Sequence, residues 1–517
     1  MHTRVNGGAV IGLDGAPICV EVDISSGLPK TTIVGLPDAA VDEARERVRS
    51  AIRNAGAGFP TKRVTVNLAP AHIRKEGAGY DLPIAVGMLV ATGQVCESAV
   101  QDTLFLGELA LDGELRHVRG VLSVAAAARD ASVKRIVVPR VDAEEASLID
   151  GIEVLAVDSL RDWIEIATEE RPISDAIWPT ACVVEDDPGS SYDGHDFSDV
   201  RGQEHVKRAL EVAAAGGHNL LMCGPPGAGK TLLASCLPGI LPPLTTQEAL
   251  EVTKIASISG MTGGNKLIRE RPFRAPHHTI SNAGLVGGGQ RLRPGEVTMA
   301  HRGVLFLDEL PEFSVRALET MRQPLEDRRI TISRAHGTVT YPADVCLVGA
   351  MNPCPCGNFG SDQHCTCTDG AVYRYQRRIS GPVLDRIDMF VDVPRVDVQK
   401  LMESSTESSP PSAEPSTEVR RRVVRARNVQ RGRFGSDGPN ANATLSAREV
   451  NQHCYGSVDD RARMLIQEAV DRLNLSARGF HRVLKVARTI SDLAESEQIT
   501  AQHVAEAVQY RRRSNLN

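Results

Sequence analysis

The first third of the chain mixes two hydrophobic patterns, one typical of strands and one typical of helices. Residues 17–22 (PICVEV) and 63–68 (RVTVNL) have the composition and the alternation of strands with one buried face. Between them, apolar residues recur at helical spacing and predict a helix over residues 38–54, with Asp38 as its N-cap. Residues 153–157 predict another short strand, so residues 1–168 are expected to form a domain of mixed strands and helices.

Three continuous apolar runs in the middle of the chain predict buried strands. They are residues 220–223 (LLMC), 304–307 (VLFL) and 345–350 (VCLVGA). Runs without polar positions are typical of strands that are covered on both faces, as in a parallel sheet flanked by helices. A helix is expected to begin at Lys230, shortly after the first of these strands.

Composition divides the rest of the chain into segments. Residues 169–195 are rich in Asp, Pro, Ser and Gly and are expected to be a linker. Residues 196–401 contain the buried strands and form the expected core. The low-complexity stretch 402–418 is expected to be a disordered linker, and residues 419–517 have a helical pattern.

The overall composition is that of an ordinary globular protein, with 42% hydrophobic and 24% charged residues among 517. The net charge of -6 excludes a globally basic nucleic-acid binder but leaves room for a local basic surface. No apolar run is long enough to span a membrane, and the N-terminus lacks the pattern of a signal peptide. We therefore expect a cytoplasmic protein with no membrane partner.

A glycine-rich loop directly follows the first buried strand. It matches the G-x-x-x-x-G-K-T pattern with Gly224, Pro225, Pro226, Gly227, Ala228, Gly229, Lys230 and Thr231. Backbone N–H groups of such a loop surround phosphate oxygens, and the following helix N-terminus adds a favourable dipole. Lys230 is expected to reach the β- and γ-phosphates of ATP, and the Thr231 hydroxyl to ligate Mg²⁺.

Polar residues also follow the other two buried strands. Asp308 and Glu309 end the second strand, and Asn352 follows the third. An acid at such a position holds Mg²⁺, and the next one can activate the attacking water. We assign Asp308 to Mg²⁺, Glu309 to the general base and Asn352 to positioning of the water near the γ-phosphate.

Four of the eleven cysteines form two C-x-C pairs in one Gly- and Asp-rich loop: Cys354, Cys356, Cys365 and Cys367. Four thiolates at this spacing can surround Zn²⁺ as a structural site, with His364 as a possible substitute ligand. Reduced free thiols and a redox disulfide are the alternatives. A cytoplasmic setting disfavours the disulfide.

The order of these motifs resembles the AAA+ family and, within it, the magnesium-chelatase-like YifB/ComM proteins. The likeness extends over nearly the whole chain through residues 199–203 (DVRGQ), 271–279 (RPFRAPHHT), 294–296 (PGE), 300–303 (AHRG) and 379–388 (ISGPVLDRID). The resemblance implies an α/β fold: a P-loop AAA+ core, whose parallel sheet has helices on both faces, and a helical lid. It also implies a homo-hexameric ATPase that acts on DNA.

Three further site residues follow from the resemblance. Arg386 lies in the segment that supplies the arginine finger in this branch, and Arg478 in the segment that supplies the sensor-2 arginine of the lid. Arg478 would contact the γ-phosphate of its own subunit or of a neighbour. Val200 would border the adenine. A surface salt bridge is the alternative for Arg386, and Arg482 and Arg488 on the same predicted helix are alternatives to Arg478. A finger that acts on a neighbour's ATP requires head-to-tail contacts, which close into rings or extend as filaments.

Residues 1–168 are similar to the Lon-protease-type domain, an α+β fold of the ribosomal S5 domain 2 type, through residues 107–115 (GELALDGEL) and 134–139 (KRIVVP). A Lon protease needs a nucleophilic serine and an activating lysine. No serine lies between Ala51 and Glu97, and residues 120–124 (GVLSV) contain no lysine. We therefore expect this domain to be non-proteolytic.

Three basic segments are candidates for contact with DNA. Residues 328–341 predict a β-hairpin that could line a pore, and residues 269–293 hold five arginines and the pair His277–His278. The histidines are equally well explained as structural hydrogen-bonding groups. Residues 419–433 hold seven arginines, on either a DNA-facing helix or an ordinary solvated helix face.

The leading hypothesis is an ATP-hydrolysing ring motor acting on single-stranded or branched DNA, a helicase or branch-migration motor, possibly in recombination during natural transformation. The first alternative is a magnesium-chelatase-like motor subunit that remodels a metal-insertion complex. The second is an ATP-dependent protease or unfoldase, which the missing serine and lysine disfavour.

Overall fold

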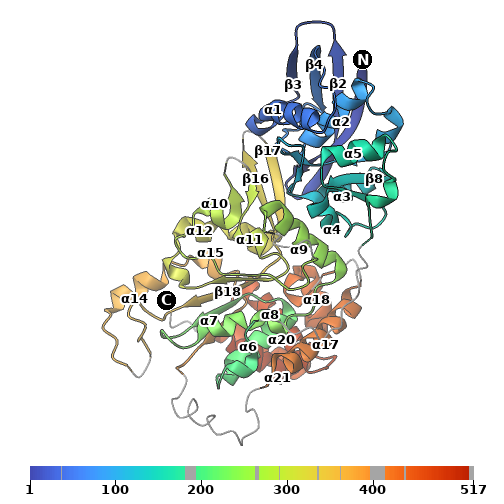
Figure 1. The fold of residues 1–517 in the computed structure, drawn as a ribbon. Helices are drawn as coiled ribbons and strands as arrows, with labels where there is room; N and C mark the ends of the chain where they lie inside the picture. The colour runs from blue at the N-terminus through green and yellow to red at the C-terminus, as the bar shows by residue number, and fades with distance from the viewer. Residues whose placement is uncertain are drawn as a thin grey trace, which may run out of the picture. The chain divides into compact units, whose positions relative to one another are not determined.

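The fold is described from a computed structural model of the chain. It describes residues 1–511 except 37, 181–193, 262–266, 290–291, 335–336, 361–362, 396–413, 436–437 and 440. The chain divides into two compact units (Figure 1). Unit 1 contains Met1–Asp186 and Ala249–Ile268, and unit 2 contains Asp187–Glu248 and Arg269–Asn517.

Unit 1 is built on an eight-stranded mixed sheet in the order β10-β9-β8-β5-β1-β2-β4-β3. The strands are β1 (His2–Ile11), β2 (Asp14–Ser25), β3 (Lys30–Val34), β4 (Arg63–Ala69), β5 (Thr103–Phe105), β8 (Arg135–Pro139), β9 (Glu153–Val157) and β10 (Ile177–Trp178). The pairs β1–β2, β2–β4 and β9–β10 are antiparallel and the others are parallel. A small hairpin, β6 (Glu108–Leu109) with β7 (Leu115–Arg116), lies beside this sheet.

The helices of unit 1 pack on this sheet through their apolar faces. They are α1 (Ala39–Asn54), α2 (Asp81–Ala91), α3 (Val121–Asp130), α4 (Ala143–Ala146) and α5 (Leu160–Ala167). The predicted helix 38–54 is confirmed as α1, and its N-cap Asp38 accepts a hydrogen bond from the Val41 N–H at 2.9 Å. The predicted strands at 17–22, 63–68 and 153–157 are confirmed as parts of β2, β4 and β9.

Two features of unit 1 differ from the sequence-based boundaries. Strand β10 pairs with β9, so ordered structure continues into the range that composition marks as a linker from residue 169. Helix α9 (Thr246–Ser259) comes from the range expected to belong to the core, yet most of it belongs to unit 1. There the Ser257 hydroxyl donates to Glu145 at 2.6 Å and accepts from the Gly120 N–H at 3.0 Å. Such long-range polar contacts leave no trace in local composition.

Unit 2 contains a five-stranded parallel sheet in the order β12-β15-β18-β11-β19. Its strands are β11 (Leu220–Cys223), β12 (Phe273–Arg274), β15 (Val304–Leu307), β18 (Cys346–Met351) and β19 (Met389–Asp392). The three predicted buried strands are confirmed as β11, β15 and β18. The accompanying helices are α6 (Glu204–Gly216), α7 (Lys230–Ser235), α8 (Leu237–Ile240), α10 (Asn282–Val286), α11 (Glu296–Met299), α12 (Val315–Thr320), α13 (Arg322–Asp327), α14 (Asp369–Gln376) and α15 (Gly381–Leu384).

Two hairpins extend from the core of unit 2. The predicted hairpin over 328–341 is confirmed as β16 (Arg329–Arg334) and β17 (Gly337–Pro342), which pair antiparallel. A shorter one joins β13 (Gly287–Gly288) to β14 (Arg293–Pro294).

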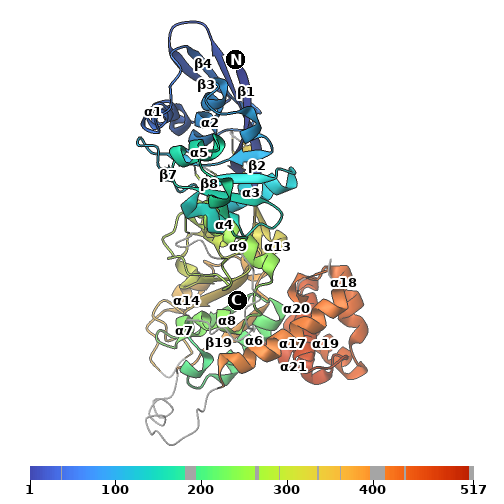
Figure 2. The same ribbon diagram turned by 45° about the vertical axis from the view of Figure 1, so that its right-hand side comes forward.

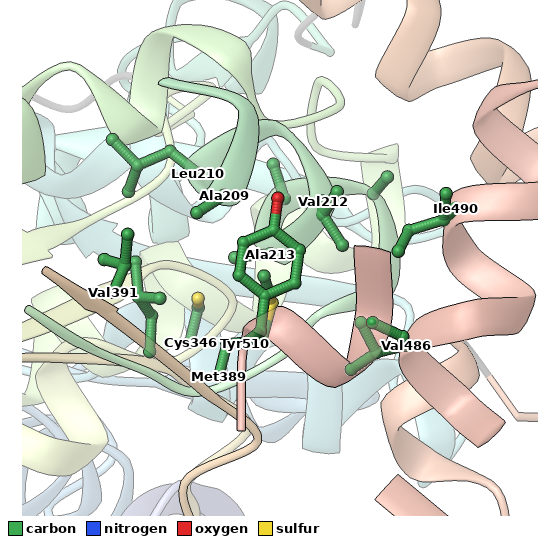
Figure 3. Packing of buried hydrophobic residues seen from close by; sticks show 14 of the residues in the cluster. Ala209, Leu210, Val212, Ala213, Cys346, Met389, Val391, Val486, Ile490 and Tyr510 are labelled. Atoms are coloured by element: carbon green, nitrogen blue, oxygen red, sulfur yellow. The ribbon is translucent and has the colours of Figure 1, made fainter. Parts of the chain in front are cut away.

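The last part of unit 2 is helical, as the sequence predicts (Figure 2). It consists of α17 (Ser416–Phe434), α18 (Ala447–His453), α19 (Asp460–Leu473), α20 (Ala477–Leu493) and α21 (Ala501–Gln509). Helix α17 begins inside the range that composition marks as a disordered linker, most of which lies outside the described residues. Helices α17 and α20 pack against α6, and Figure 3 shows Val486, Ile490 and Tyr510 gathered with Ala209 and Val212 in one buried cluster. No helix within the described ranges is long and apolar enough to cross a membrane.

A buried ion pair joins α1 to α2 in unit 1. The Asp81 side chain is fully buried, and its carboxylate accepts from Arg47 Nε at 2.7 Å and Nη2 at 3.0 Å. It also accepts from the Leu109 N–H at 3.2 Å. Removing one partner of a buried pair leaves the other charge in a poorly solvated place.

We expect Arg47→Ala, which leaves the fully buried Asp81 carboxylate without its ion-pair partner, to lower the free energy of unfolding of the protein by about 3–5 kcal/mol. The matched control is Glu153→Ala, which removes the half-exposed pair with Arg135 and should cost at most about 1 kcal/mol. Urea unfolding followed by circular dichroism measures both. Equal losses would contradict the importance of the buried pair.

Candidate nucleotide-binding site

The glycine-rich loop joins strand β11 to helix α7 and shapes a pocket of about 410 Å³. The lining residues are Pro226, Gly227, Ala228, Gly229, Lys230, Thr231, Asp308, Glu309, Met351 and Asn352. Gly227 and Gly229 have φ angles of 75° and 79°, which favour glycine, and a Cβ atom at either would meet no neighbour. The loop conformation therefore requires glycine for its backbone and leaves the space beside it open.

The start of the loop is fixed by close backbone contacts. The Gly224 N–H donates to the Met351 carbonyl at 3.1 Å, and a Cβ on Gly224 would lie 2.2 Å from the Val393 carbonyl oxygen. Only glycine allows this approach. The loop is thus tied to the ends of β18 and β19.

Lys230 is buried, with only 8% of its surface exposed, at the N-terminus of α7. Its Nζ donates to the carbonyls of Gly224 at 2.7 Å and Pro225 at 3.0 Å and to Asn352 Oδ1 at 3.2 Å. Desolvation lowers the pKa of Lys230, while the nearby carboxylates of Asp308 and Glu309 oppose that shift. A buried cation at a helix N-terminus fits a polyphosphate.

Oxygen atoms suited to Mg²⁺ lie beside this lysine. The Thr231 hydroxyl donates to Asp308 Oδ2 at 3.0 Å, and Asp308 Oδ1 accepts from the Glu309 N–H at 2.8 Å. Hydroxyl and carboxylate oxygens are the ligands that Mg²⁺ prefers. The residues present therefore fit ATP together with Mg²⁺.

A residue outside the predicted set contacts Glu309. His278 Nδ1 lies 3.3 Å from Glu309 Oε2, and the His278 ring lies against the His277 ring, with centroids 4.1 Å apart and ring planes tilted by 33°. Both histidines belong to the segment 269–293, which is predicted to contact DNA. No spacing in the sequence links His278 to Glu309, because the two residues come from separate loops of the folded chain.

Arg386 and Arg478 lie together, in a different pocket of about 450 Å³. Arg386 donates to the Arg322 carbonyl at 3.0 Å and to the Glu326 carboxylate, and Arg478 Nη2 lies 3.7 Å from the other oxygen of Glu326. No residue of the glycine-rich loop lines this second pocket. The structure therefore joins the two arginines to each other and not to the phosphate loop of their own chain.

Val200 is also absent from the lining of the loop pocket. It is 4% exposed and belongs to the same hydrophobic cluster as Phe197. The neighbouring Gln203 instead reaches the loop, since its Nε2 donates to the carbonyls of Ala228 at 2.9 Å and Pro394 at 2.8 Å. A role for Val200 at the adenine remains a prediction.

The four clustered cysteines converge after strand β18. Their Sγ atoms all lie within 4.8 Å of one another, with Cys354–Cys356 at 3.3 Å, Cys354–Cys365 at 3.8 Å and Cys356–Cys365 at 3.6 Å. These distances are far longer than a disulfide bond, and all four thiols are free. Four sulfur atoms placed tetrahedrally at about 2.3 Å from Zn²⁺ lie about 3.8 Å apart, so the cluster has the size of such a site.

Three protein-family models match successive parts of the chain. The model for magnesium chelatase, subunit ChlI, matches residues 196–401, and the model for the C-terminal part of that subunit matches residues 413–511. A model described as subunit ChlI of Mg-chelatase matches residues 20–142. These models match residues in both units of the structure.

Curated proteins match over nearly the full length. The uncharacterized protein YifB of Escherichia coli K12 is 44% identical over 511 residues, which cover 99% of this chain and 96% of YifB. The competence protein ComM of Haemophilus influenzae is 41% identical over 506 residues, which cover 97% of this chain and 96% of ComM. Lon protease 2 of Bacillus subtilis is 29% identical over 184 residues, covering 31% of this chain and 33% of that protein.

The fold and the phosphate loop define a magnesium-chelatase-like AAA+ protein with a helical lid and an N-terminal Lon-protease-like domain. Within this class, the chain belongs to the family of YifB and ComM. Membership implies an ATPase that uses ATP and Mg²⁺.

Two substitutions in the loop pocket should affect nucleotide binding and ATP hydrolysis differently. Lys230→Ala removes the buried cation and should abolish binding of a fluorescent ATP analogue. Glu309→Gln keeps the size and the hydrogen-bonding capacity of the side chain but removes its basicity, so it should bind ATP normally and hydrolyse it about 10²–10⁴-fold more slowly. Binding titrations and phosphate-release assays measure the two steps. Normal turnover by Glu309→Gln would refute the assignment of the base.

Proposed function

We propose that the protein is an ATP-hydrolysing ring motor that acts on DNA, of the helicase or branch-migration type. The ring is supported by one observation: the phosphate loop lines one pocket, whereas Arg386 and Arg478 line a different one. The similarity to ComM, which is named a competence protein, supports a role on DNA during natural transformation.

Within one subunit, the loop pocket supplies the groups for hydrolysis. Lys230 holds the phosphates, Thr231 and Asp308 hold Mg²⁺, and Glu309 accepts the proton of the attacking water. Asn352 positions that water, and its contact with Lys230 supports this role. His278 orients the Glu309 carboxylate through the contact between their side chains.

The neighbouring subunit completes the site in this proposal. Arg386 and Arg478 approach the γ-phosphate of the adjacent subunit and stabilise the charge that develops during transfer. Contacts of this head-to-tail kind generate a closed ring, and six subunits is the number that the family resemblance implies. Glu326 holds both arginines when no neighbour is bound.

Mixing two inactive variants tests the shared site. Lys230→Ala and Arg386→Ala should each lack ATPase activity, but mixed rings should recover part of it, because a Lys230→Ala subunit still offers Arg386 to an intact loop. A mixture of Lys230→Ala with Glu309→Gln is the matched control. It should recover nothing, since both groups act in the same pocket. ATPase assays of co-expressed variants give the answer, and equal inactivity of both mixtures would overturn the shared site.

The hairpin β16–β17 offers a surface suited to phosphates. One face carries a ladder of hydroxyls, with Thr331–Thr340 at 3.2 Å and Ser333–Thr338 at 3.0 Å. The other face buries Ile330 and the Tyr341 ring. Hydroxyls and arginines are frequent partners of the nucleic-acid backbone, so this hairpin is the proposed DNA contact.

The arginines of α17 are less suited to DNA. Arg422 pairs with Glu211 and Glu414, and Arg433 pairs with Asp492. Arg427 donates to the Ala214 carbonyl, and burial lowers its pKa to about 10. Arg422 and Arg427 thus join α17 to helix α6 of the core, and Arg433 joins α17 to α20, which favours the structural explanation of this basic helix.

The exposed arginines of the hairpin β16–β17 allow the proposed contact with DNA to be tested. Single-stranded or four-way-junction DNA should stimulate ATP hydrolysis, and Arg329→Ala or Arg334→Ala should weaken the stimulation while leaving the rate without DNA unchanged. Each lost phosphate contact should reduce the salt dependence of DNA binding by about one unit of slope. Arg472→Ala on helix α19, another exposed arginine, is the control and should have no effect.

The same DNA titration separates this function from its alternatives. A magnesium-chelatase-like motor subunit, which the names of the family models favour, would hydrolyse ATP at a rate that no DNA changes. An ATP-dependent protease would cleave casein, yet the N-terminal domain lacks a serine between Ala51 and Glu97. If no form of DNA changes the ATPase rate, the proposal of a DNA motor is therefore wrong.

Zn²⁺ is the ion proposed for the four cysteines. Zn²⁺ bound by four thiolates is a closed, structural type of site with no open position for substrate. His364 is exposed and lies outside the cluster of possible ligands, so the cysteines alone would hold the ion.

A further inference from the structure

The cysteine loop, defined here as Cys354–Gly360 and Gln363–Cys367, lies next to the nucleotide pocket. It begins directly after Asn352 and Pro353, at the end of β18. Gly357 is buried with a φ of 83°, and a Cβ atom built on it would lie 2.4 Å from Pro226 Cδ. The backbone of the cysteine loop therefore rests on a residue of the phosphate loop.

The same segment is anchored on its other side by helix α14. Gln376 Nε2 donates to the Pro353 carbonyl at 3.0 Å. The backbone of Asn352 donates to the Tyr375 hydroxyl, whose pKa burial raises to about 12. The residues that enter the cysteine loop are thus held between the phosphate loop and α14.

Backbone N–H groups point at the sulfur atoms. The Phe359 N–H donates to Cys354 Sγ at 3.3 Å, and the backbones of Asn358 and Thr366 donate to Cys356. Cys365 and Cys367 also each accept a backbone hydrogen bond. Backbone N–H donors around the sulfur atoms are typical of the outer shell that orients the ligands of a metal site.

We infer that Zn²⁺ bound by the cysteine loop acts as a brace for the nucleotide pocket, fixing Pro226 through Gly357 and Asn352 through the start of the loop. The inference rests on the proposed ATP and zinc sites. Without the ion, the cysteine loop would lose the metal bonds that join its two C-x-C pairs, and both contacts with the pocket would loosen. Misplacement of a positioning group by about 1 Å can reduce a rate 10²-fold.

Two glycines of the cysteine loop provide a matched pair of variants. Gly357 and Gly360 both have positive φ angles, 83° and 74°, so alanine strains the backbone at each. A Cβ atom meets Pro226 at Gly357 but no neighbour at Gly360. Gly357→Ala therefore pushes the loop away from the phosphate loop with all four cysteines intact, and Gly360→Ala controls for strain alone.

The experiment measures zinc content, affinity for a fluorescent ATP analogue and ATPase rate without DNA, all on the full chain. The wild type and both glycine variants should hold about one Zn²⁺ per chain. Gly357→Ala should bind nucleotide or hydrolyse it at least about tenfold more poorly than Gly360→Ala. The double variant Cys365→Ser/Cys367→Ser should lose zinc and show the same defect, while its circular dichroism stays that of a folded protein.

Each contrary result points to a different failure. Absence of zinc from the wild type overturns the metal site. The proposal of a brace is wrong if the zinc-free cysteine variant binds and hydrolyses ATP normally. It is also wrong if the two glycine variants have the same nucleotide affinity and ATPase rate. Failure of DNA to stimulate the ATPase bears only on the proposed DNA motor, because these measurements contain no DNA.

Discussion

The parallel alignment of β11, β15 and β18 is the constraint on which the candidate site depends. Because parallel strands end at the same edge of a sheet, residues that are far apart in sequence meet there. Lys230 and Thr231 follow β11, Asp308 and Glu309 follow β15, and Asn352 follows β18. Their mutual hydrogen bonds are consequences of this register, and any change in strand order would separate them.

The lid is joined to this sheet by both apolar and polar contacts. Side chains of α20 and Tyr510 share one hydrophobic cluster with α6 and β19. The Phe390 N–H donates to the Tyr510 carbonyl at 2.8 Å, and Arg511 Nη1 donates to the Asp388 carbonyl at 3.2 Å. Asp388 is largely buried. Desolvation raises its pKa, but contacts with His218, Arg482 and the Asn219 N–H outweigh this effect and lower the pKa below its usual value. The segment that carries Arg386 is therefore fixed to the lid that carries Arg478.

Local patterns predict much of the fold because local physics determines those parts. The apolar runs identify β11, β15 and β18, and helical spacing with an acidic N-cap identifies α1. The loop motif likewise predicts the pocket around Lys230. What local patterns miss depends on long-range contacts: the membership of α9 in unit 1, the pairing of β10 with β9, and the approach of His278 to Glu309. The adenine contact of Val200 stays a prediction, because this side chain is buried with Phe197 in the core and does not line the loop pocket.

Polar groups of the loop pocket are already hydrogen-bonded to one another within this chain. Lys230 is bonded to loop carbonyls and Asn352, and Asp308 to Thr231 and the Glu309 N–H. On the other side, the Glu326 carboxylate accepts a hydrogen bond from Arg386 and lies 3.7 Å from Arg478 Nη2. A nucleotide that binds here must therefore replace hydrogen bonds that already exist within the protein. Each new hydrogen bond replaces an old one, so its net contribution to the binding free energy is small. Nucleotide binding and hydrolysis therefore depend on where each group lies. The cysteine loop contacts Pro226 and begins shortly after Asn352, so it affects two places in the pocket at once.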